Sequence, residues 1–596
     1  MKIQAVDYTI LVALVSELQQ EWIPSRLEQV YQYDRHTICL ALRTLEKRDW
    51  LWISWHPQAA RIHMGDRPPR DPDTFTFSEQ LRHLIKGSAL IGIEFIQPWE
   101  RVIDLQFGTR PNDPPTWHLY VEIMGKHSNV ILTNTNQQIV TTAQQITGDR
   151  SSVRPVETGQ PYDFPPALTK TAPSLEESFE RWQERISLLP KPLKQQLLAN
   201  YRGVSPLLLE EMIAAAKLEP EQNTHDLTLE QWQNLFIQWH FWLTALEKKE
   251  FQAIFDHETY SVIPWHHRVT LGEFKHREKI NLQRLVNNYY RDQTNTQNFQ
   301  QLHHQLQQKL HITLKKLRQK ADTFASRLKQ SKGADLCRKQ GDLLMSYLHE
   351  WRVGMTEIIL TDFESEQPLK ISLKPDKNAV QNAQSFYKQH QKLKRASQVV
   401  QPLLDEVQAE IHYLEQIEAS LEQLVNYQNP DDLETLQEIR EELIQQNYLS
   451  TNREVNQKKE LSKPHIYPTP SGGELWIGRN NQQNDHLTFR VANDYDLWFH
   501  SQEIPGSHVL LRLPPGAVPD DQDLQWAADF AAYFSRAKQS EQVPVVYTQP
   551  KNVYKPKGTK PGMCIYKRET ILWGQPQRAI QAIATQARQE KTVLSN

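Results

Sequence analysis

The 596-residue sequence contains only three cysteines, Cys39, Cys337 and Cys564, and they lie far apart. This spacing forms neither a disulfide framework nor a metal-ligand motif, and it is typical of a protein from a reducing cytosol. No stretch approaches the roughly 18–20 apolar residues that a membrane helix needs, and no signal peptide follows Met1. We therefore expect neither secretion nor membrane anchoring.

Common catalytic motifs are missing as well. The sequence has no glycine-rich phosphate loop with its lysine, no nucleophile elbow and no metalloprotease helix motif. Asp496, His500 and His508 offer carboxylate and imidazole groups that suit zinc or manganese, so a metal-dependent nuclease is one alternative. No further histidine or carboxylate has a compelling spacing. We expect a protein with no catalytic residues, no metal and no cofactor.

Charge is unevenly distributed along the chain. The net charge of −3 and the mean hydropathy of −0.65 give no overall sign of nucleic-acid binding. Between Lys309 and Lys339, however, many lysines and arginines are opposed only by Asp322 and Asp335. Such a local excess suggests contact with a phosphate backbone, and a solvated helix face is the alternative.

A second basic cluster near the C-terminus contains tyrosines between its cations. Aromatic rings can stack on bases while neighbouring cations neutralise phosphates, so the cluster favours RNA over a plain exposed hairpin. The tyrosines are Tyr547, Tyr554 and Tyr566, and the cations are Lys551, Lys555, Lys557, Lys560, Lys567 and Arg568.

The sequence predicts an α+β multidomain protein with four parts. Residues 1–168 form a mixed N-terminal domain, and residues 169–255 form a helical domain with a helix-hairpin-helix. Residues 285–445 form a long antiparallel coiled coil with a small globular tip at about 352–396. Residues 455–575 form a C-terminal α+β RNA-binding domain.

Local patterns give the elements of the first two domains. Apolar residues at helical spacing predict helices over Tyr8–Glu21 and Phe77–Ile85. Ser205 and Pro206 are typical of a helix start, and the glycine turn before them could offer backbone N–H groups to a phosphate. An ordinary helical linker is the alternative. Strands are predicted over His36–Leu42, Trp50–Trp55, Ala60–Met64, Val102–Phe107, Trp117–Ile123 and Asn129–Thr133.

Two long segments have apolar residues at alternating spacings of four and three, as in the seam of a coiled coil. Glu418 interrupts the second segment. Between the two, Thr356–Leu360 and Leu369–Leu373 are predicted strands, and Ala379–Arg395 is a predicted helix. The seam positions are Leu310, Leu314, Leu317, Ala321, Phe324 and Leu328 in the first segment, and Leu404, Val407, Ile411, Leu414, Leu421 and Val425 in the second.

The segment 493–512 alternates like two strands joined by a Pro-Gly turn. Polar, aromatic and cationic side chains fall on one face, and apolar side chains fall on the other. Such a face suits a polar, planar, anionic ligand such as nucleic acid, and a cluster that defines the fold is the alternative. A helix is predicted over Leu524–Gln539. The polar face consists of Asp496, Trp498, His500, His508 and Arg512.

Short motifs along essentially the whole chain resemble those of the NFACT family. In the C-terminal part they are 477–485 (IGRNNQQND), 496–500 (DLWFH), 505–509 (PGSHV) and 555–562 (KPKGTKPG). Earlier in the chain they are 54–57 (SWHP), 61–63 (RIH), 124–129 (MGKHSN), 382–384 (NAQ) and 392–394 (KLK).

The resemblance implies a ribosome quality control factor in the cytoplasm. Such a factor binds stalled large (50S) ribosomal subunits that carry nascent peptidyl-tRNA, and it recruits alanyl-tRNA. It supports template-free alanine tailing, which marks the nascent chain for degradation. The implied partners are rRNA, tRNA and a small RqcP-like helper protein, with no membrane. Because the family is also labelled fibronectin-binding, a cell-surface adhesin is a further alternative.

The resemblance also implies site residues. An Asp-Arg pair that the family uses for tRNA recruitment matches Glu100 and Arg101, where Glu keeps the charge but moves the carboxylate by a methylene. Asp7 matches an N-terminal aspartate with a similar role. The residues themselves allow Glu100 and Arg101 to hold an RNA end or an amino group, or to form a structural ion pair. The expected RNA-binding residues of the last domain are Asp496, Trp498, His500, His508, Lys555, Lys557 and Lys560.

Overall fold

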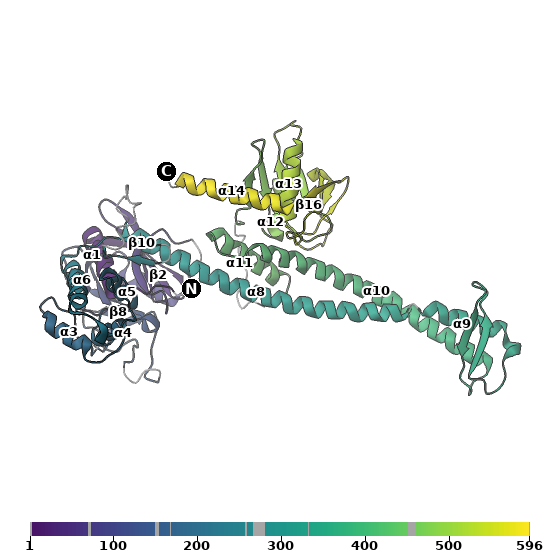
Figure 1. Cartoon of the computed structure of the whole chain (residues 1–596), viewed down its shortest axis with the longest axis horizontal. Coiled ribbons are helices and arrows are strands. Elements are labelled where there is room, and N and C mark those ends of the chain that lie inside the picture. The colour runs from purple at the N-terminus through teal and green to yellow at the C-terminus, as the bar shows by residue number, and fades with distance from the viewer. Residues whose placement is uncertain are drawn as a thin grey trace. The chain divides into compact units, whose positions relative to one another are not determined.

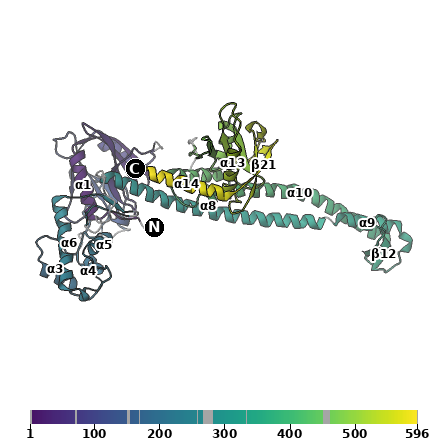
Figure 2. The same cartoon turned by 45° about the horizontal axis from the view of Figure 1, so that its top comes forward.

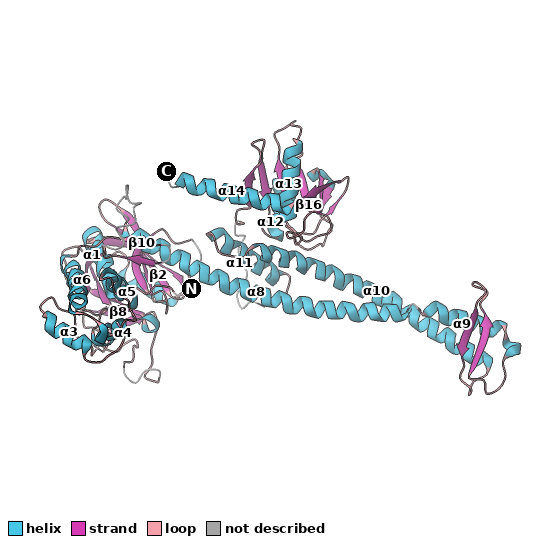
Figure 3. Cartoon of the chain, in the orientation of Figure 1, coloured by secondary structure: helices cyan, strands magenta, loops and turns pink. Residues whose placement is uncertain are grey.

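A computed structural model describes residues 3–594, except 70–72, 150–153, 167–168, 257–258, 266–280, 332 and 451–460. Its mixture of helices and strands confirms the predicted α+β class (Figure 3). The chain divides into two compact units, Met1–Thr294 and Asn295–Asn596, and helix α8 (Leu282–Ser331) passes from the first into the second. No helix among the described residues is long and apolar enough to cross a membrane.

A nine-stranded antiparallel sheet forms the first part of the N-terminal unit, in the order β4-β3-β2-β1-β5-β6-β7-β8-β9. Helix α1 (Tyr8–Trp22) packs its apolar side chains into the main core of the sheet, and α2 (Thr76–Ile85) lies against β1. Both helices were predicted. The strands are β1 (Ser25–Asp34), β2 (Thr37–Arg43), β3 (Arg48–Ser54), β4 (Arg61–Gly65), β5 (Ala89–Phe95), β6 (Val102–Gly108), β7 (Trp117–Glu122), β8 (Asn129–Asn134) and β9 (Ile139–Thr142).

The six predicted strands are confirmed as β2, β3, β4, β6, β7 and β8. Strands β1, β5 and β9 were not predicted. The β1 pairing with β2 has register shifts at Leu27/Gln29 and Gln32/Asp34, and β5 has one at Leu90/Gly92. A bulge adds a residue and breaks the two-residue alternation by which a strand is recognised.

Helices α3 to α6 and a short hairpin complete the N-terminal unit. Buried Trp182, Trp239 and Trp242 belong to the same core as α1 and the sheet, and the Trp242 indole donates a hydrogen bond to Thr9 at 2.9 Å. Ser205 is confirmed as a helix N-cap. The elements are α3 (Phe179–Ser187), α4 (Leu193–Asn200), α5 (Pro206–Ala215), α6 (Leu229–Lys248), β10 (Ile254–Asp256) and β11 (Thr259–Ser261).

Helices α8 and α10 (Ala379–Gln423) lie side by side in both views and form the predicted antiparallel coiled coil (Figures 1 and 2). Helix α11 (Pro430–Gln445) adds a third apolar face at its base. The predicted seam position Val425 is wrong, because α10 ends at Gln423 and Val425 is 67% exposed.

The predicted tip is also present at the far end of the coiled coil. It consists of α9 (Ala334–Ser346), the hairpin β12 (Glu357–Thr361) and β13 (Pro368–Ser372), and the first turns of α10, around a small separate core. The helix predicted to end at Arg395 continues to the end of α10.

A six-stranded sheet in the order β14-β15-β17-β16-β18-β21 forms the C-terminal domain, with α13 (Asp521–Tyr533) packed on one face. The helix predicted to reach Gln539 stops at Tyr533, because the Phe534 carbonyl binds the Ser507 amide at 2.9 Å. The other elements are α12 (Asn481–His486), α14 (Pro576–Leu594), β14 (His465–Pro468), β15 (Glu474–Ile477), β16 (Leu497–Ser501), β17 (Val509–Arg512), β18 (Val543–Thr548), β21 (Thr570–Gly574), β19 (Val553–Tyr554) and β20 (Ile565–Tyr566).

The coiled-coil seam offers a matched pair of substitutions. Leu421→Ala should lower the free energy of unfolding by about 2–5 kcal/mol, because it opens a cavity at a buried position. Val425→Ala, on an exposed side chain, should change it by less than about 0.5 kcal/mol. Chemical denaturation followed by circular dichroism measures both. Equal effects would show that the seam extends to Val425 after all.

Candidate nucleic-acid interfaces

The N-terminal candidate site is built around Asp7, which is buried at the start of α1. Its Oδ1 accepts a hydrogen bond from the Ile10 amide at 2.9 Å, and its Oδ2 accepts one from the Ser205 hydroxyl at 2.6 Å. Burial raises the pKa of Asp7, although these hydrogen bonds and the charge of Arg101 oppose the rise. Because Ser205 caps α5, a single carboxylate joins the starts of two helices.

Glu100 and Arg101 follow β5 and lie beside Asp7. Arg101 Nη1 donates a hydrogen bond to the Val6 carbonyl at 3.1 Å, and no other hydrogen bond of this guanidinium is found among the described residues. Burial lowers the pKa of Arg101, and the charges of Asp7 and Glu100 raise it. The structure therefore brings the three predicted residues together, although their role in binding tRNA stays a prediction.

Two residues that the sequence did not indicate complete this site. Arg202 Nη1 lies 3.8 Å from Glu100 Oε1, and the buried Arg202 Nε has no hydrogen-bond partner among the described residues. The Trp99 ring packs 4.9 Å from that of Tyr8. In the sequence, the glycine after Arg202 indicates a turn at this position. It does not indicate which other segment the turn contacts.

Gly203 explains why the turn before α5 can close on the β5–β6 loop. Its φ is +78°, and a Cβ at this position would lie 2.5 Å from the Trp99 ring. Glycine therefore satisfies both the backbone conformation and the close approach. The result is a carboxylate, Glu100, beside two guanidinium groups that keep N–H donors without an acceptor among the described residues. This arrangement suits a phosphate or the edge of a base.

The C-terminal strands alternate as predicted, but their polar face is not open. Asp496 is fully buried and accepts hydrogen bonds from the amides of Asn493 (2.8 Å) and Leu513 (3.2 Å). Trp498 is 1% exposed and donates to the Thr488 hydroxyl at 3.1 Å. This burial favours the alternative of a cluster that defines the fold, because other segments of the domain cover this side of the sheet. A role of these residues in binding RNA stays a prediction.

Of the two histidines of the motif, His508 is buried and His500 is partly buried. The Nδ1 of buried His508 is 2.7 Å from the Thr488 hydroxyl, and the His500 and His508 rings are 5.5 Å apart. Burial lowers the pKa of His500 to about 4 and that of His508 well below its ordinary value. Both rings are therefore neutral at pH 7 and add no charge for a phosphate. Within the described residues, no group of three or more His, Cys, Asp and Glu side chains could hold a metal ion.

The three predicted lysines of the last domain have different environments. Lys555 forms an ion pair with Asp485. Lys560 donates to the Tyr448 hydroxyl and lies 4.9 Å from the centre of that ring, and burial lowers its pKa. Lys557 is exposed. Of the three, Lys557 has the surroundings expected of a contact with RNA phosphate.

Polar side chains dock the C-terminal domain on the base of the coiled coil. Buried Arg479 pairs with buried Asp432, the N3 residue of α11. Glu442 of α11 accepts hydrogen bonds from Tyr413 (2.6 Å) and from Asn481 (3.0 Å). Burial raises the pKa of Glu442 to about 7. None of these contacts is evident from the sequence, because the partners are far apart along the chain.

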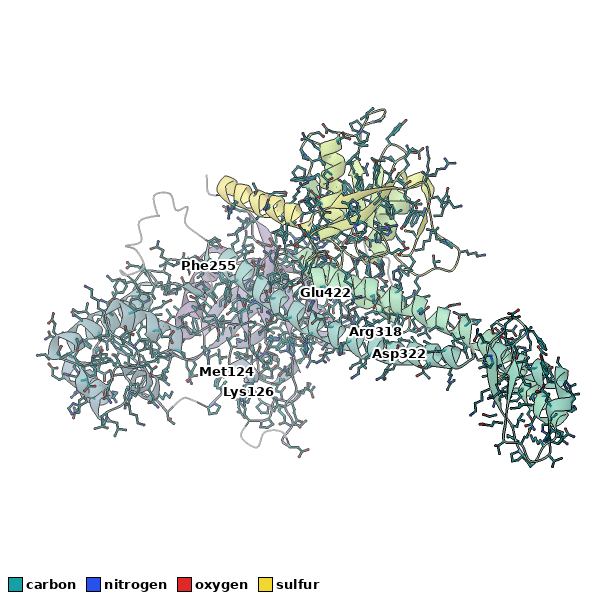
Figure 4. All side chains as sticks on the ribbon, turned by 45° about the vertical axis from the view of Figure 1, so that its right-hand side comes forward. Met124, Lys126, Phe255, Arg318, Asp322 and Glu422 are labelled. Atoms are coloured by element: carbon teal, nitrogen blue, oxygen red, sulfur yellow. The ribbon has the colours of Figure 1, made fainter. Side chains whose placement is uncertain are left out.

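The basic segment of the coiled coil remains a charged surface. Lys309, Lys315 and Lys316 are exposed. Arg318, which Figure 4 labels beside Asp322, pairs with Glu415 at 2.7 Å. Lys332 lies outside the described residues. Toward the tip, Lys339 pairs with Asp362 and Glu364, so part of the apparent excess of positive charge is balanced within the fold.

Comparison with known proteins covers nearly the whole chain. Residues 7–462 match the NFACT N-terminal and middle domains, and residues 463–568 match the NFACT protein RNA binding domain. The chain is 31% identical over 583 residues to the Rqc2 homolog RqcH of Bacillus subtilis, covering 96% of this chain and 98% of that one. It is 29% identical to RqcH of Streptococcus pneumoniae, with 95% and 97% covered.

The chain belongs to the NFACT family. A solved structure of the C-terminal part of the fibronectin/fibrinogen-binding protein from Streptococcus suis is also similar, at 32% identity, covering 47% of this chain and 95% of that one. Its TM-score is 0.36, so the family assignment depends on the full-length relatives.

The docking contacts predict a dependence of stability on pH. Because the pKa of Glu442 is about 7 in the folded protein and 4.5 ordinarily, its protonated form stabilises the fold. This contribution, about 3 kcal/mol, is complete below about pH 4.5 and is lost as the pH rises to about 7. Glu442→Gln should remove it, and calorimetry of the full chain at pH 5 and pH 8 measures the difference.

The control for this experiment is Glu406→Gln, which removes an exposed carboxylate from α10. The role given to Glu442 would be excluded if the wild-type protein and Glu442→Gln lost the same stability between the two pH values.

Proposed function

We propose that this protein is a ribosome quality control factor that binds stalled 50S subunits with their nascent peptidyl-tRNA and recruits alanyl-tRNA for C-terminal alanine tailing. Family membership and the close match to RqcH relatives support a role in ribosome quality control. The geometry adds one central observation. Arg101 is held beside Asp7 and Glu100, and only one of its N–H donors is used by another described residue.

The chemistry asked of the protein is positioning. Peptide transfer would occur at the catalytic centre of the ribosome, where proximity and orientation supply much of the rate. The protein would hold tRNA and rRNA and would need no nucleophile of its own. Buried Asp7 would set the positions of α1 and α5, while Arg101 would contact RNA. The exposed lysines of the coiled coil and Lys557 would add sequence-independent attraction to phosphates.

Glu100 stands where the family motif has aspartate. Its carboxylate lies 3.8 Å from Arg202, so the longer side chain reaches a cation supplied by the turn before α5. We infer that Glu100 orients Arg202 and that Arg101 makes the direct contact with tRNA. A small RqcP-like protein would be a further partner.

The two alternative functions find less support in the structure. Both oxygens of Asp496 accept backbone N–H groups, and His508 is bound to Thr488, so these residues do not form an open metal site for a nuclease. The name fibronectin-binding is carried by a solved relative, and no feature of the described surface favours an adhesin.

Arg101→Ala should lower the amount of copurifying tRNA at least about tenfold, because a guanidinium contact to phosphate or base is lost. Binding to 50S subunits, measured by sedimentation, should change much less. Arg101→Lys keeps the charge without the planar donor pair and should restore only part of the tRNA. Equal loss of tRNA and subunit binding in both variants would contradict the assignment.

Lys557→Ala and Lys560→Ala should separate binding from folding. The first should reduce the slope of log K against log salt for single-stranded RNA by about 0.7, because one phosphate contact disappears. The second should lower the melting temperature, because it removes the cation between Tyr413 of α10 and Tyr448, which follows α11. An unchanged salt slope for Lys557→Ala would assign that loop to structure alone.

A further inference from the structure

A cavity of about 390 Å³ opens in the N-terminal domain, away from Asp7 and Arg101. Strands β1 and β3, the loop after β4 and helix α2 line it. Two aromatic residues, Tyr31 and Trp50, form part of its wall together with two prolines. Tyr31 and Trp50 belong to a small cluster that is separate from the main core of the sheet. The cavity is large enough for one small ligand.

Three cations, Arg67, Arg82 and Lys86, line the same cavity. Arg82 and Lys86 are four residues apart at the end of α2, so they point to the same side of the helix. Neither Arg67 nor Lys86 forms an ion pair with any carboxylate among the described residues. Among the described residues, no acidic side chain lines the cavity. Asp73 balances the charge of Arg82, so Arg67 and Lys86 supply the positive charge that a ligand would meet.

Arg82 is fixed in place by a network beneath the cavity. Its Nη2 donates to Asp73 Oδ2 at 2.8 Å, and its Nε donates to the Val30 carbonyl at 3.4 Å. Asp73 also accepts hydrogen bonds from Ser78 (2.7 Å) and from the Gln32 amide (2.9 Å). A cation held this firmly loses little freedom when a ligand binds.

We propose that this cavity binds a phosphorylated nucleoside, with its base against Tyr31 and Trp50 and its phosphate among Arg67, Arg82 and Lys86. Flat apolar walls next to cations are the combination by which proteins hold single-stranded nucleotides. An inorganic anion would leave the aromatic wall unused, and an acidic peptide would lack a planar group for it.

The inference that the cavity binds a nucleotide rests on the proposed function in one respect only, namely where that nucleotide comes from. That source is either one residue of a bound RNA or a free mononucleotide, and both present the same chemistry. The cavity shares no lining residue with the Asp7 site, so either site can fail without the other.

Photo-crosslinking of the full chain locates the ligand directly. The probe is a single-stranded RNA of about 12 nucleotides that carries 4-thiouridine. We expect crosslinked peptides to contain Tyr31, Trp50 or the 82–86 segment. Crosslinks confined to the C-terminal domain or to the Asp7 site would overturn the inference. The tRNA copurification test of Arg101→Ala would be unaffected by that result.

Paired variants test the cations. Arg67→Ala with Lys86→Ala should weaken binding of this RNA about tenfold, since two phosphate contacts are lost. The control, Arg110→Ala with Lys191→Ala, removes the same charge from exposed positions outside the cavity and should change binding much less. Equal weakening by the two pairs, at equal melting temperatures, would overturn the inference.

Two further ligands identify the source and test the chemistry. If uridine monophosphate binds the wild-type chain but not the Arg67→Ala, Lys86→Ala variant, the cavity is a site for free nucleotide. If the RNA binds but uridine monophosphate does not, and the Arg67→Ala, Lys86→Ala variant weakens RNA binding, the cavity is a site for one residue of an RNA chain. Poly-glutamate carries negative charge but no planar ring. If it displaces the RNA at the same concentration of charge, the role given to the aromatic wall would be overturned.

Discussion

Carboxylates removed from water join distant segments within both units of this protein, and each must be given hydrogen-bond donors. Asp7 receives them from the starts of α1 and α5. Asp73 receives them from α2 and β1, and Asp432 binds Arg479 of the C-terminal domain. Because breaking such a pair leaves a buried charge without compensation, each carboxylate fixes two segments that are distant in sequence. The geometry of the candidate sites follows from these fixed positions.

The same principle separates structural charge from charge available to a ligand. Lys555, Arg318 and Arg479 form ion pairs within the protein, so their charges are already balanced. Arg101 keeps N–H donors that no described residue accepts, and Lys557 stays exposed. Since RNA binding depends on neutralising phosphates, the second group is the one that can supply it. A count of cations along the sequence cannot distinguish the two groups.

Much of the fold could be predicted because its signals are local. Helical spacing gave α1 and α2, a heptad pattern gave the α8–α10 pair, and turn residues bounded six strands of the first sheet. The failures also have physical causes. Bulges in β1 and β5 interrupt the alternation of their side chains. Val425 fits the heptad spacing, but the helix that would place it in the seam ends two residues earlier.

By itself, the sequence determined the class of the fold, the coiled coil with its tip, and the nearness of Glu100 to Arg101, because these depend on spacing along the chain. Only the tertiary structure decided that Arg202 joins that pair, and that Asp496, Trp498 and His508 are interior residues. It alone brought Tyr31, Trp50 and three cations around one cavity. Alternation tells which side chains share a face of a strand, but what covers that face depends on contacts between distant segments.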